Sequence, residues 1–291
     1  MRVHQTIGLA AVLNFGLTVV EVGAFFLTNS LTVGASALHD VGDCFLLLAS
    51  YAAEKLSLKR PDRRRTFGYR RLSIVAAFFN ALVLLGGSLV IIGESIRRLI
   101  MPEVIETAGL VWLAGAGLMI NGFLGWRLSR GHSLNERVIS WHFFEDFFGW
   151  LGILFLAAAG PLINRSWVDP LIAIIFAAIV FANALRNLIK ILNILLEGTP
   201  SDISLPELIS AVKKVEGVTA LHDIHCWTTD NLYHCFTAHI VVDEQFWNWE
   251  DCYCLKNSIK RLLEENGVPH STLELERSHS CSLGTCLGAR F

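Results

Sequence analysis

Long apolar runs fill the first two thirds of the chain, and polar and apolar positions mix evenly only after residue 198. Windows of about 20 apolar residues are long enough to cross a bilayer as helices. Six such windows lie at about residues 5–27, 32–55, 73–97, 107–128, 138–160 and 168–192. The pattern therefore predicts a membrane all-α bundle of six spans over residues 1–197.

Residues 198–291 have the alternation of a small α/β domain. "SLPELISAVKKVEGV" and "WNWEDCYCLKNSIKRLLEENGV" predict two helices, the first with Ser204 as its cap and Gly217 at its end. "TALHDIHCWTTD" and "YHCFTAHIVVD" alternate like paired strands, and "STLELER" predicts a last strand. The order αββαβ favours an antiparallel or mixed three-stranded sheet with helices on one face, as in a metallochaperone-like domain.

Composition and charge agree with a membrane protein and indicate its orientation. The chain is 53% hydrophobic and 17% charged, whereas soluble domains are about 25% charged. Eight Lys/Arg residues lie between Lys55 and Arg71 and three more within 127–137, so the positive-inside rule predicts that these loops and both termini are cytoplasmic. The net charge of −2 argues against a nucleic-acid binder. The cysteines of a cytosolic tail are expected to be thiols or metal ligands rather than disulfides.

Two histidine–aspartate pairs interrupt the apolar runs with identical spacing. His39 and Asp43 lie in "SALHDVGDCF", and His142 and Asp146 lie in "SWHFFEDFFGW". Residues i and i+4 share one helix face, and an ionisable group at mid-bilayer costs about 2.5–3.5 kcal/mol on insertion scales. A helix–helix hydrogen bond would explain one such pair. Two pairs indicate two helix faces, each with a histidine and an aspartate, whose side chains bind one ion together.

Two imidazoles and two carboxylates form an N₂O₂ set that suits tetrahedral Zn²⁺. Two aspartates neutralise one divalent cation, and protons can neutralise the same site when the metal leaves, so exchange of metal for protons is the low-cost cycle. Asp40 lies about 100° around the helix from His39, and it either lines the access path or makes a local hydrogen bond. Glu21 and Asn121, also mid-span, are assigned to interhelical hydrogen bonding.

These stretches resemble the cation diffusion facilitator family of six-span divalent-metal/proton antiporters. "NSLTVGASALHDVGD" resembles the family's second-helix signature, "TFGYRRLSIVAAFFNALVLL" its third-helix entry, and "ALHDIHCWTTD" with "TAHIVVD" its cytoplasmic domain. The resemblance implies alternating access, a homodimer held partly by the cytoplasmic domains, and a transport site made of His39, Asp43, His142 and Asp146. Ser36 departs from the pattern, since many members carry an aspartate there. The short second cytosolic loop favours a bacterial origin, and hence the inner membrane.

The resemblance also implies a second zinc site in the tail. It places cytoplasmic ligands at His222 and His239, with Glu274 and Glu276 near a carboxylate or histidine position on the last strand. Further candidates are His225, Cys252, Cys254, His279, Cys281 and Cys286. The alternatives are a half-buried sheet face for the strand residues and a tail of free thiols for the terminal cluster.

Three classes of function remain to be weighed. The leading hypothesis is proton-coupled export of Zn²⁺, with Cd²⁺, Co²⁺ and Ni²⁺ as alternative main substrates because they accept the same ligands. A membrane-anchored metal sensor or scaffold is the second class, although an anchor does not need two opposed ligand edges. A metalloenzyme would need an open coordination position and a general base such as H-E-x-x-H, a motif that the sequence lacks. The basic stretch "RPDRRR" either marks topology and meets anionic lipid or pairs with acidic groups of the tail.

Overall fold

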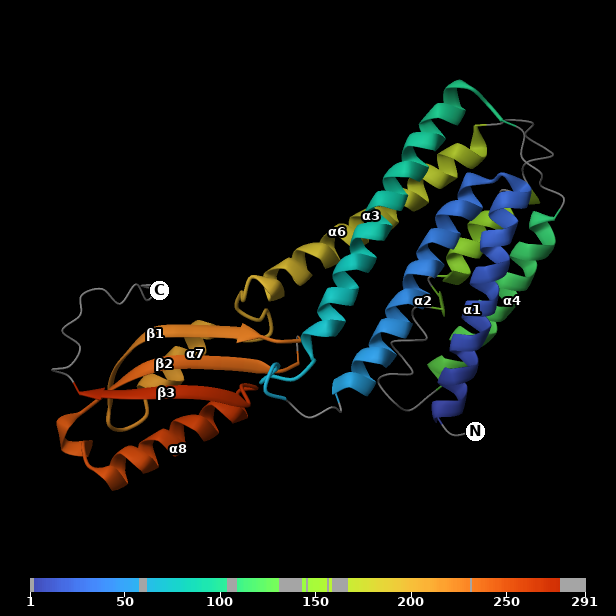
Figure 1. The fold of residues 1–291 in the computed structure, drawn as a ribbon. Coiled ribbons are helices and arrows are strands. Elements are labelled where there is room, and N and C mark those ends of the chain that lie inside the picture. The colour runs from blue at the N-terminus through green and yellow to red at the C-terminus, as the bar shows by residue number, and fades with distance from the viewer. Residues whose placement is uncertain are drawn as a thin grey trace. The chain divides into compact units, whose positions relative to one another are not determined.

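The chain forms two compact units in the computed structural model (Figure 1). The described residues are 3–57, 62–103, 109–130, 143–144, 146–155, 157–158, 167–230 and 232–277. The first unit comprises Met1–Glu54 and Ala76–Leu188, and the second comprises Lys55–Val75 and Ile189–Phe291. The basic loop before residue 76 therefore groups with the C-terminal residues rather than with the helices that flank it in sequence.

Long apolar helices make up most of the first unit (Figure 1). They are α1 (Val3–Thr28), α2 (Leu31–Ser57), α3 (Arg71–Ile100), α4 (Leu110–Ser129) and α6 (Val168–Leu195), with a shorter apolar helix at Asp146–Phe155. Among the described residues, α3 and α6 are long and apolar enough to cross a membrane. The window 138–160 is described only in part, so the count of six spans stays a prediction.

The N-terminus of α2 is capped by a side chain of α6. Asp169 is 1% exposed, and its carboxylate accepts hydrogen bonds from the backbone amides of Leu31 at 2.8 Å and Thr32 at 3.1 Å. The Ser30 hydroxyl donates to the same carboxylate at 2.6 Å. The first amides of a helix have no partner within the helix, so Asp169 satisfies them across the unit and ties α2 to α6.

The turn between α1 and α2 is also held by α3. Asn29 has a φ of 54°, a left-handed conformation that asparagine tolerates. Arg98, near the end of α3, donates to the backbone carbonyl of Asn29 at 2.5 Å and to its side-chain oxygen at 2.7 Å. Glu94 and Glu103 pair with the same guanidinium at 3.1 and 3.3 Å. Two acidic side chains therefore balance the charge of this buried arginine, and oxygen atoms of Asn29 accept hydrogen bonds from its guanidinium.

The second unit is built on a three-stranded mixed sheet (Figure 1). Its strands are β1 (Val218–Thr228), β2 (His234–Val242) and β3 (His270–Arg277), with β1 antiparallel and β3 parallel to the central β2. α7 (Leu205–Lys213) precedes β1. A 3₁₀ helix η1 (Glu244–Phe246) and α8 (Trp249–Glu265) join β2 to β3. This long crossover allows the two strands to run parallel.

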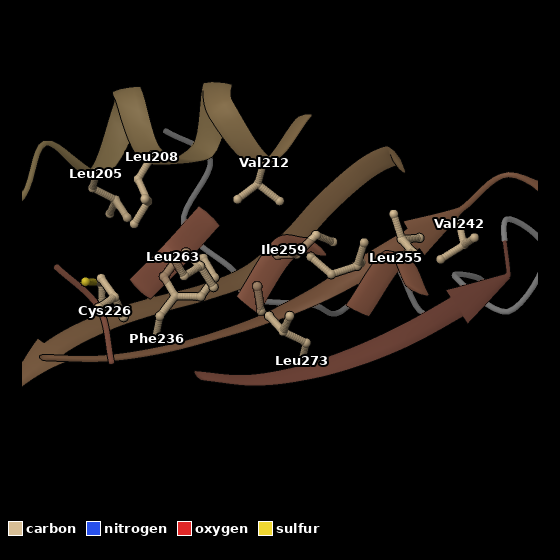
Figure 2. Close-up of a cluster of buried hydrophobic side chains, with 13 residues drawn as sticks. Leu205, Leu208, Val212, Cys226, Phe236, Val242, Leu255, Ile259, Leu263 and Leu273 are labelled. Atoms are coloured by element: carbon tan, nitrogen blue, oxygen red, sulfur yellow. The ribbon is translucent and has the colours of Figure 1, made fainter. Parts of the chain in front are cut away.

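One face of the sheet carries the apolar core of the second unit (Figure 2). Successive strand residues point to opposite faces, so Phe236 and Ile240 of β2 face the helices while His239 points the other way. α7 contributes Leu205, Leu208 and Val212, and α8 contributes Leu255, Ile259 and Leu263, all buried. Both helices therefore cover the same face, and His222 and His239 lie on the opposite one.

The loop before α3 packs on the sheet of the second unit. The Arg70 guanidinium lies over the Tyr233 ring at 4.6 Å and pairs with Asp230 at 3.4 Å. The Phe67 ring meets the His270 imidazole edge-on, with centroids 5.5 Å apart. Among the described residues of this loop and the start of α3, the ion pairs to acidic groups of the second unit come from Arg70 and from Arg71, the first residue of α3, which pairs with Glu197 at 3.2 Å.

Candidate metal centres

The first centre lies on one face of α2. His39 and Asp43 are one helical turn apart, and Nε2 of His39 lies 3.4 Å from Oδ2 of Asp43. Asp146, at the start of the helix Asp146–Phe155, brings Oδ1 to 3.9 Å from the same nitrogen. The Asp146 side chain is 2% exposed. Three of the four predicted transport ligands are thus brought together, and the fourth, His142, lies outside the described residues.

These separations fit a single bound cation. Bonds of about 2.1 Å to a tetrahedral ion put neighbouring ligand atoms about 3.4 Å apart, which is the distance between His39 and Asp43. One ligand atom from each of four residues lies within 4.8 Å of all the others, and these are His39, Asp40, Asp43 and Asp146. From the helix period alone, two roles stayed open for Asp40. Its carboxylate in fact belongs to this group.

Close helix packing positions both ligand-bearing helices. A Cβ at Gly42 of α2 would lie 2.7 Å from the Leu84 side chain of α3, and one at Gly87 of α3 would lie 2.7 Å from Leu38. On the other side, the indole of Trp150 occupies the space where Gly117 of α4 has no side chain. Glycine at these positions lets α2 and the helix that carries Asp146 approach their neighbours closely.

Glu21 is a further buried carboxylate beside the first centre. It lies on α1, its side chain is completely buried, and it faces Asp40 and Ser36 closely enough to interact with both. The sequence predicted only an interhelical hydrogen bond for Glu21. The sequence showed Glu21 as a charged residue in the middle of an apolar helix, but no local pattern indicated that Asp40 would be its neighbour.

The second centre lies on the face of the sheet opposite α7 and α8. His222 of β1 and His239 of β2 are directly paired across the strands, with ring centroids 5.1 Å apart. Glu276 of β3 reaches both, with Oε1 2.6 Å from Nδ1 of His239 and Oε2 3.0 Å from Nε2 of His222. One ligand atom from each of the three lies within 4.8 Å of the others. Two imidazoles and a carboxylate form a set that suits Zn²⁺ and related ions.

Two more carboxylates approach the imidazole of His239. Oε2 of Glu274 lies 3.5 Å and Oδ2 of Asp223 lies 3.6 Å from Nε2 of His239. Asp223 was not predicted as a site residue. It has a φ of 49° and sits where the β1–β2 register shifts, and its position between two histidines in "HDIH" was the available signal.

The remaining tail candidates that the structure describes do not join this group. His225 has a 60% exposed side chain and pairs with Asp223 at 3.1 Å. Cys252 and Cys254 lie on α8, which packs on the other face of the sheet, and neither belongs to a metal-capable group within the described ranges. His279, Cys281 and Cys286 lie outside the described residues.

Two further thiols are buried in the sheet. Burial raises the pKa of the Cys226 thiol to about 11, and burial also raises the pKa of Cys235. The thiolate is the metal-binding form of cysteine, so these two side chains stay protonated and are poor ligands at neutral pH. All five cysteines in the described part of the chain are free thiols.

The ligand residues of the first centre are buried or half-buried among long apolar helices. They provide what a cation needs in order to cross hydrocarbon, because charge is costly there without partners. The fold and the first centre together have the features expected of an integral membrane transporter of metal cations.

Comparison with known proteins narrows that class to one family. Residues 7–196 match the cation efflux transmembrane domain, and the chain belongs to the cation diffusion facilitator family. The cadmium, cobalt and zinc/H(+)-K(+) antiporter of Bacillus subtilis is 32% identical over 265 residues, which cover 90% of this chain and 85% of that protein. The metal cation efflux system protein CzcD of Cupriavidus metallidurans is 34% identical over 246 residues, 82% and 77% of the two chains. The zinc transporter ZitB of Escherichia coli is 31% identical over 268 residues, 90% and 83%. This membership makes the chain a metal cation transporter and not an enzyme.

Proposed function

We propose that this protein exports divalent metal cations, zinc foremost, in exchange for protons. The ion binds between α2 and the helix of Asp146–Phe155, and its ligands are His39, Asp43, His142 and Asp146. The observation that carries the proposal is the convergence of His39, Asp43 and Asp146, with separations of 3.4 and 3.9 Å, among apolar helices.

Charge balance supports the exchange for protons. One divalent cation neutralises Asp43 and Asp146, and the carboxylates need another positive charge when the ion leaves a site of low dielectric constant. The name of the Bacillus subtilis relative includes H(+) and K(+) as antiported ions. Two of the other relatives are named for zinc and for metal cation efflux.

The wider proposal concerns the tail and the membrane. The αββαβ tail binds zinc at His222, His239 and Glu276 and contributes to a homodimer, and six spans cross a bacterial inner membrane with both termini in the cytoplasm. The paired imidazoles and the shared carboxylate of Glu276 support the tail site. The concentration of Lys and Arg between residues 55 and 71 supports the orientation.

Zinc uptake into proteoliposomes containing the purified full chain tests the transport proposal. Under an imposed pH gradient, Asp43→Ala and Asp146→Ala should each abolish uptake, because each leaves the ion with one carboxylate fewer. Glu207→Ala removes an exposed carboxylate of α7 and should transport like the wild type. Wild-type rates in both aspartate variants would show that the site assignment is wrong. Zinc binding without any uptake by the wild type would favour the sensor or scaffold.

A further inference from the structure

Asp40 places a third carboxylate at the first centre. It follows His39 directly, is 3% exposed, and has a carboxylate oxygen within 4.8 Å of a ligand atom of His39, of Asp43 and of Asp146. Consecutive Cα atoms are only about 3.8 Å apart, so two adjacent side chains can converge on one point despite the angle between them. The described part of the centre therefore holds three carboxylates and one imidazole.

This ligand set exceeds what zinc requires. The described group already holds four ligand residues, and the proposed ligand His142 would make five, whereas protein sites for zinc are mostly tetrahedral with four. Carboxylate oxygen suits harder ions such as Mn²⁺, which favour octahedral oxygen-rich surroundings. Two carboxylates already balance a divalent charge, so neutrality alone does not require Asp40. Its presence is better explained by the number and kind of ligands that the cargo accepts.

Glu21 is the group that faces Asp40 from α1. Its side chain is completely buried and interacts with both Asp40 and Ser36. A buried carboxylate at this distance is placed to orient the Asp40 side chain, as the neighbours of a metal ligand commonly do. Glu21 is therefore a positioning residue for Asp40 rather than a ligand itself.

We propose that Asp40 is a fifth ligand of the transport centre, positioned by Glu21, and that it extends the cargo from zinc to divalent ions that take five or six ligands, such as Co²⁺ and Mn²⁺. This inference rests on the proposed transport function. It assigns to one aspartate a role in selecting the ion rather than in transport as such.

Competition among Zn²⁺, Co²⁺ and Mn²⁺ for uptake into proteoliposomes tests the inference on the full chain. Asp40→Asn keeps the shape of the side chain and replaces the carboxylate with a neutral amide, a weaker ligand for a divalent cation. It should keep zinc uptake within about twofold and lower Co²⁺ and Mn²⁺ uptake by about tenfold or more, the scale at which lost support weakens a metal site. Ser88→Ala removes a buried hydroxyl of α3 that bonds to the Leu84 carbonyl, and it should leave all three rates unchanged.

The outcomes separate the two proposals. An unchanged Co²⁺-to-Zn²⁺ ratio in Asp40→Asn overturns the role of Asp40 and leaves zinc transport standing. Loss of all three activities in a folded Asp40→Asn protein also overturns it, since Asp40 would then be a general requirement. A wild type that moves none of the ions overturns the transport function, and with it this inference.

The absorption spectrum of bound Co²⁺ provides a second measurement that needs no transport. Five- or six-coordinate Co²⁺ absorbs weakly in the visible range, and tetrahedral Co²⁺ absorbs strongly. The wild type in detergent should give the weak spectrum and Asp40→Asn the strong one. A strong tetrahedral spectrum in the wild type would contradict a fifth ligand.

The positioning role of Glu21 has its own readout. Glu21→Gln should shift the Co²⁺-to-Zn²⁺ uptake ratio and the Co²⁺ spectrum in the same direction as Asp40→Asn. In the Asp40→Asn background the same change should have little further effect, because the group that Glu21 positions is gone. Additive effects of the two substitutions would instead show that Glu21 acts independently of Asp40.

Discussion

The imidazole of His239 has three acidic neighbours, Glu276, Glu274 and Asp223, within 3.6 Å. His225 has one, Asp223, and is largely exposed. Two histidines on neighbouring strands of the same sheet therefore have different expected roles. One is a ligand, and the other is a surface residue.

Substitution at these two positions should separate the roles. In a background of Asp43→Ala and Asp146→Ala, which silences the transport centre, His239→Ala should weaken zinc binding to the full chain by at least about 10–100-fold, the loss seen even for groups that only support a ligand. His225→Ala is the matched control and should bind like its parent. Isothermal titration with zinc measures both. Equal affinity in the two variants would contradict the tail site.

The cysteines of the second unit should differ in reactivity because Cys226 is buried, with a raised pKa, and Cys254 is exposed. The pKa of Cys226 is raised to about 11, so the proton stays on sulfur below that pH and the nucleophilic thiolate is scarce. Cys254 is exposed on α8. Alkylation at pH 7–9, followed by peptide mass spectrometry, should modify Cys254 and leave Cys226 largely unmodified, with reactivity of Cys226 rising as the pH nears 11. Denaturation should remove the difference, and comparable rates in the native protein would contradict the raised pKa.

Among the elements, α2 depends on a neighbour for its start. Asp169→Ala removes the acceptor for two backbone amides and one hydroxyl. Loss of a cap costs about 0.5–2 kcal/mol, and each buried donor left without a partner costs about 1–3 kcal/mol. We expect the melting temperature in detergent, followed by tryptophan fluorescence, to fall by several degrees, and transport to fall with it because α2 carries His39 and Asp43.

Thr32→Val provides the graded control for Asp169→Ala. It removes only the hydrogen bond from the Thr32 hydroxyl to the Asp169 backbone carbonyl, so it should cost about 1 kcal/mol and lower the melting temperature less. A melt of Asp169→Ala that matches the wild type would mean that α2 does not depend on this cap.

Elements could largely be predicted from local pattern, but their ends could not. The helix expected after Ser204 is present as Leu205–Lys213, and it ends four residues before Gly217, the predicted end, which has a φ of 91°. Ser204 stands at the N-cap but its side chain makes no capping hydrogen bond, and Pro206 in the first turn contributes instead. The strands could be predicted from alternation because that period is local, and the same period puts Phe236 and His239 on opposite faces of the sheet.

Contacts between distant segments could not be predicted in this way. The cap of α2 by Asp169 joins residues more than 130 positions apart, and no local pattern encodes such a pair. The place of Asp40 in the first centre depends on where α1 and the helix of Asp146 lie around α2. The helix period predicted only the direction in which the Asp40 side chain points. The packing of the neighbouring helices determines which residues that side chain contacts.

At the scale of the whole molecule, the docked loop makes a measurable contribution to the second unit. Arg70→Ala removes both the ion pair to Asp230 and the stacking on Tyr233, which together are worth about 1 kcal/mol at a partly exposed position. Arg70→Lys should recover part of that, since it keeps the charge and loses the planar stack. Hydrogen exchange of the β1–β2 turn in the full chain should be faster in Arg70→Ala.

Arg64→Ala is the control for this experiment, because Arg64 is an exposed residue of the same loop. It should leave exchange in the turn unchanged. If Arg70→Ala and Arg64→Ala behave alike, the loop does not stabilise the sheet.

The grouping of residues 62–75 with the tail has a consequence for exchanging parts between relatives. A chimera that exchanges only the segment from residue 198 onward keeps Phe67 and Arg70 of this chain. Their partners His270, Asp230 and Tyr233 are then replaced by the residues of the relative. A graft that also carries the loop keeps each contact within one parent. The part of this protein that can be exchanged between relatives therefore consists of two separate stretches of sequence, the loop and the tail, which must be transferred together.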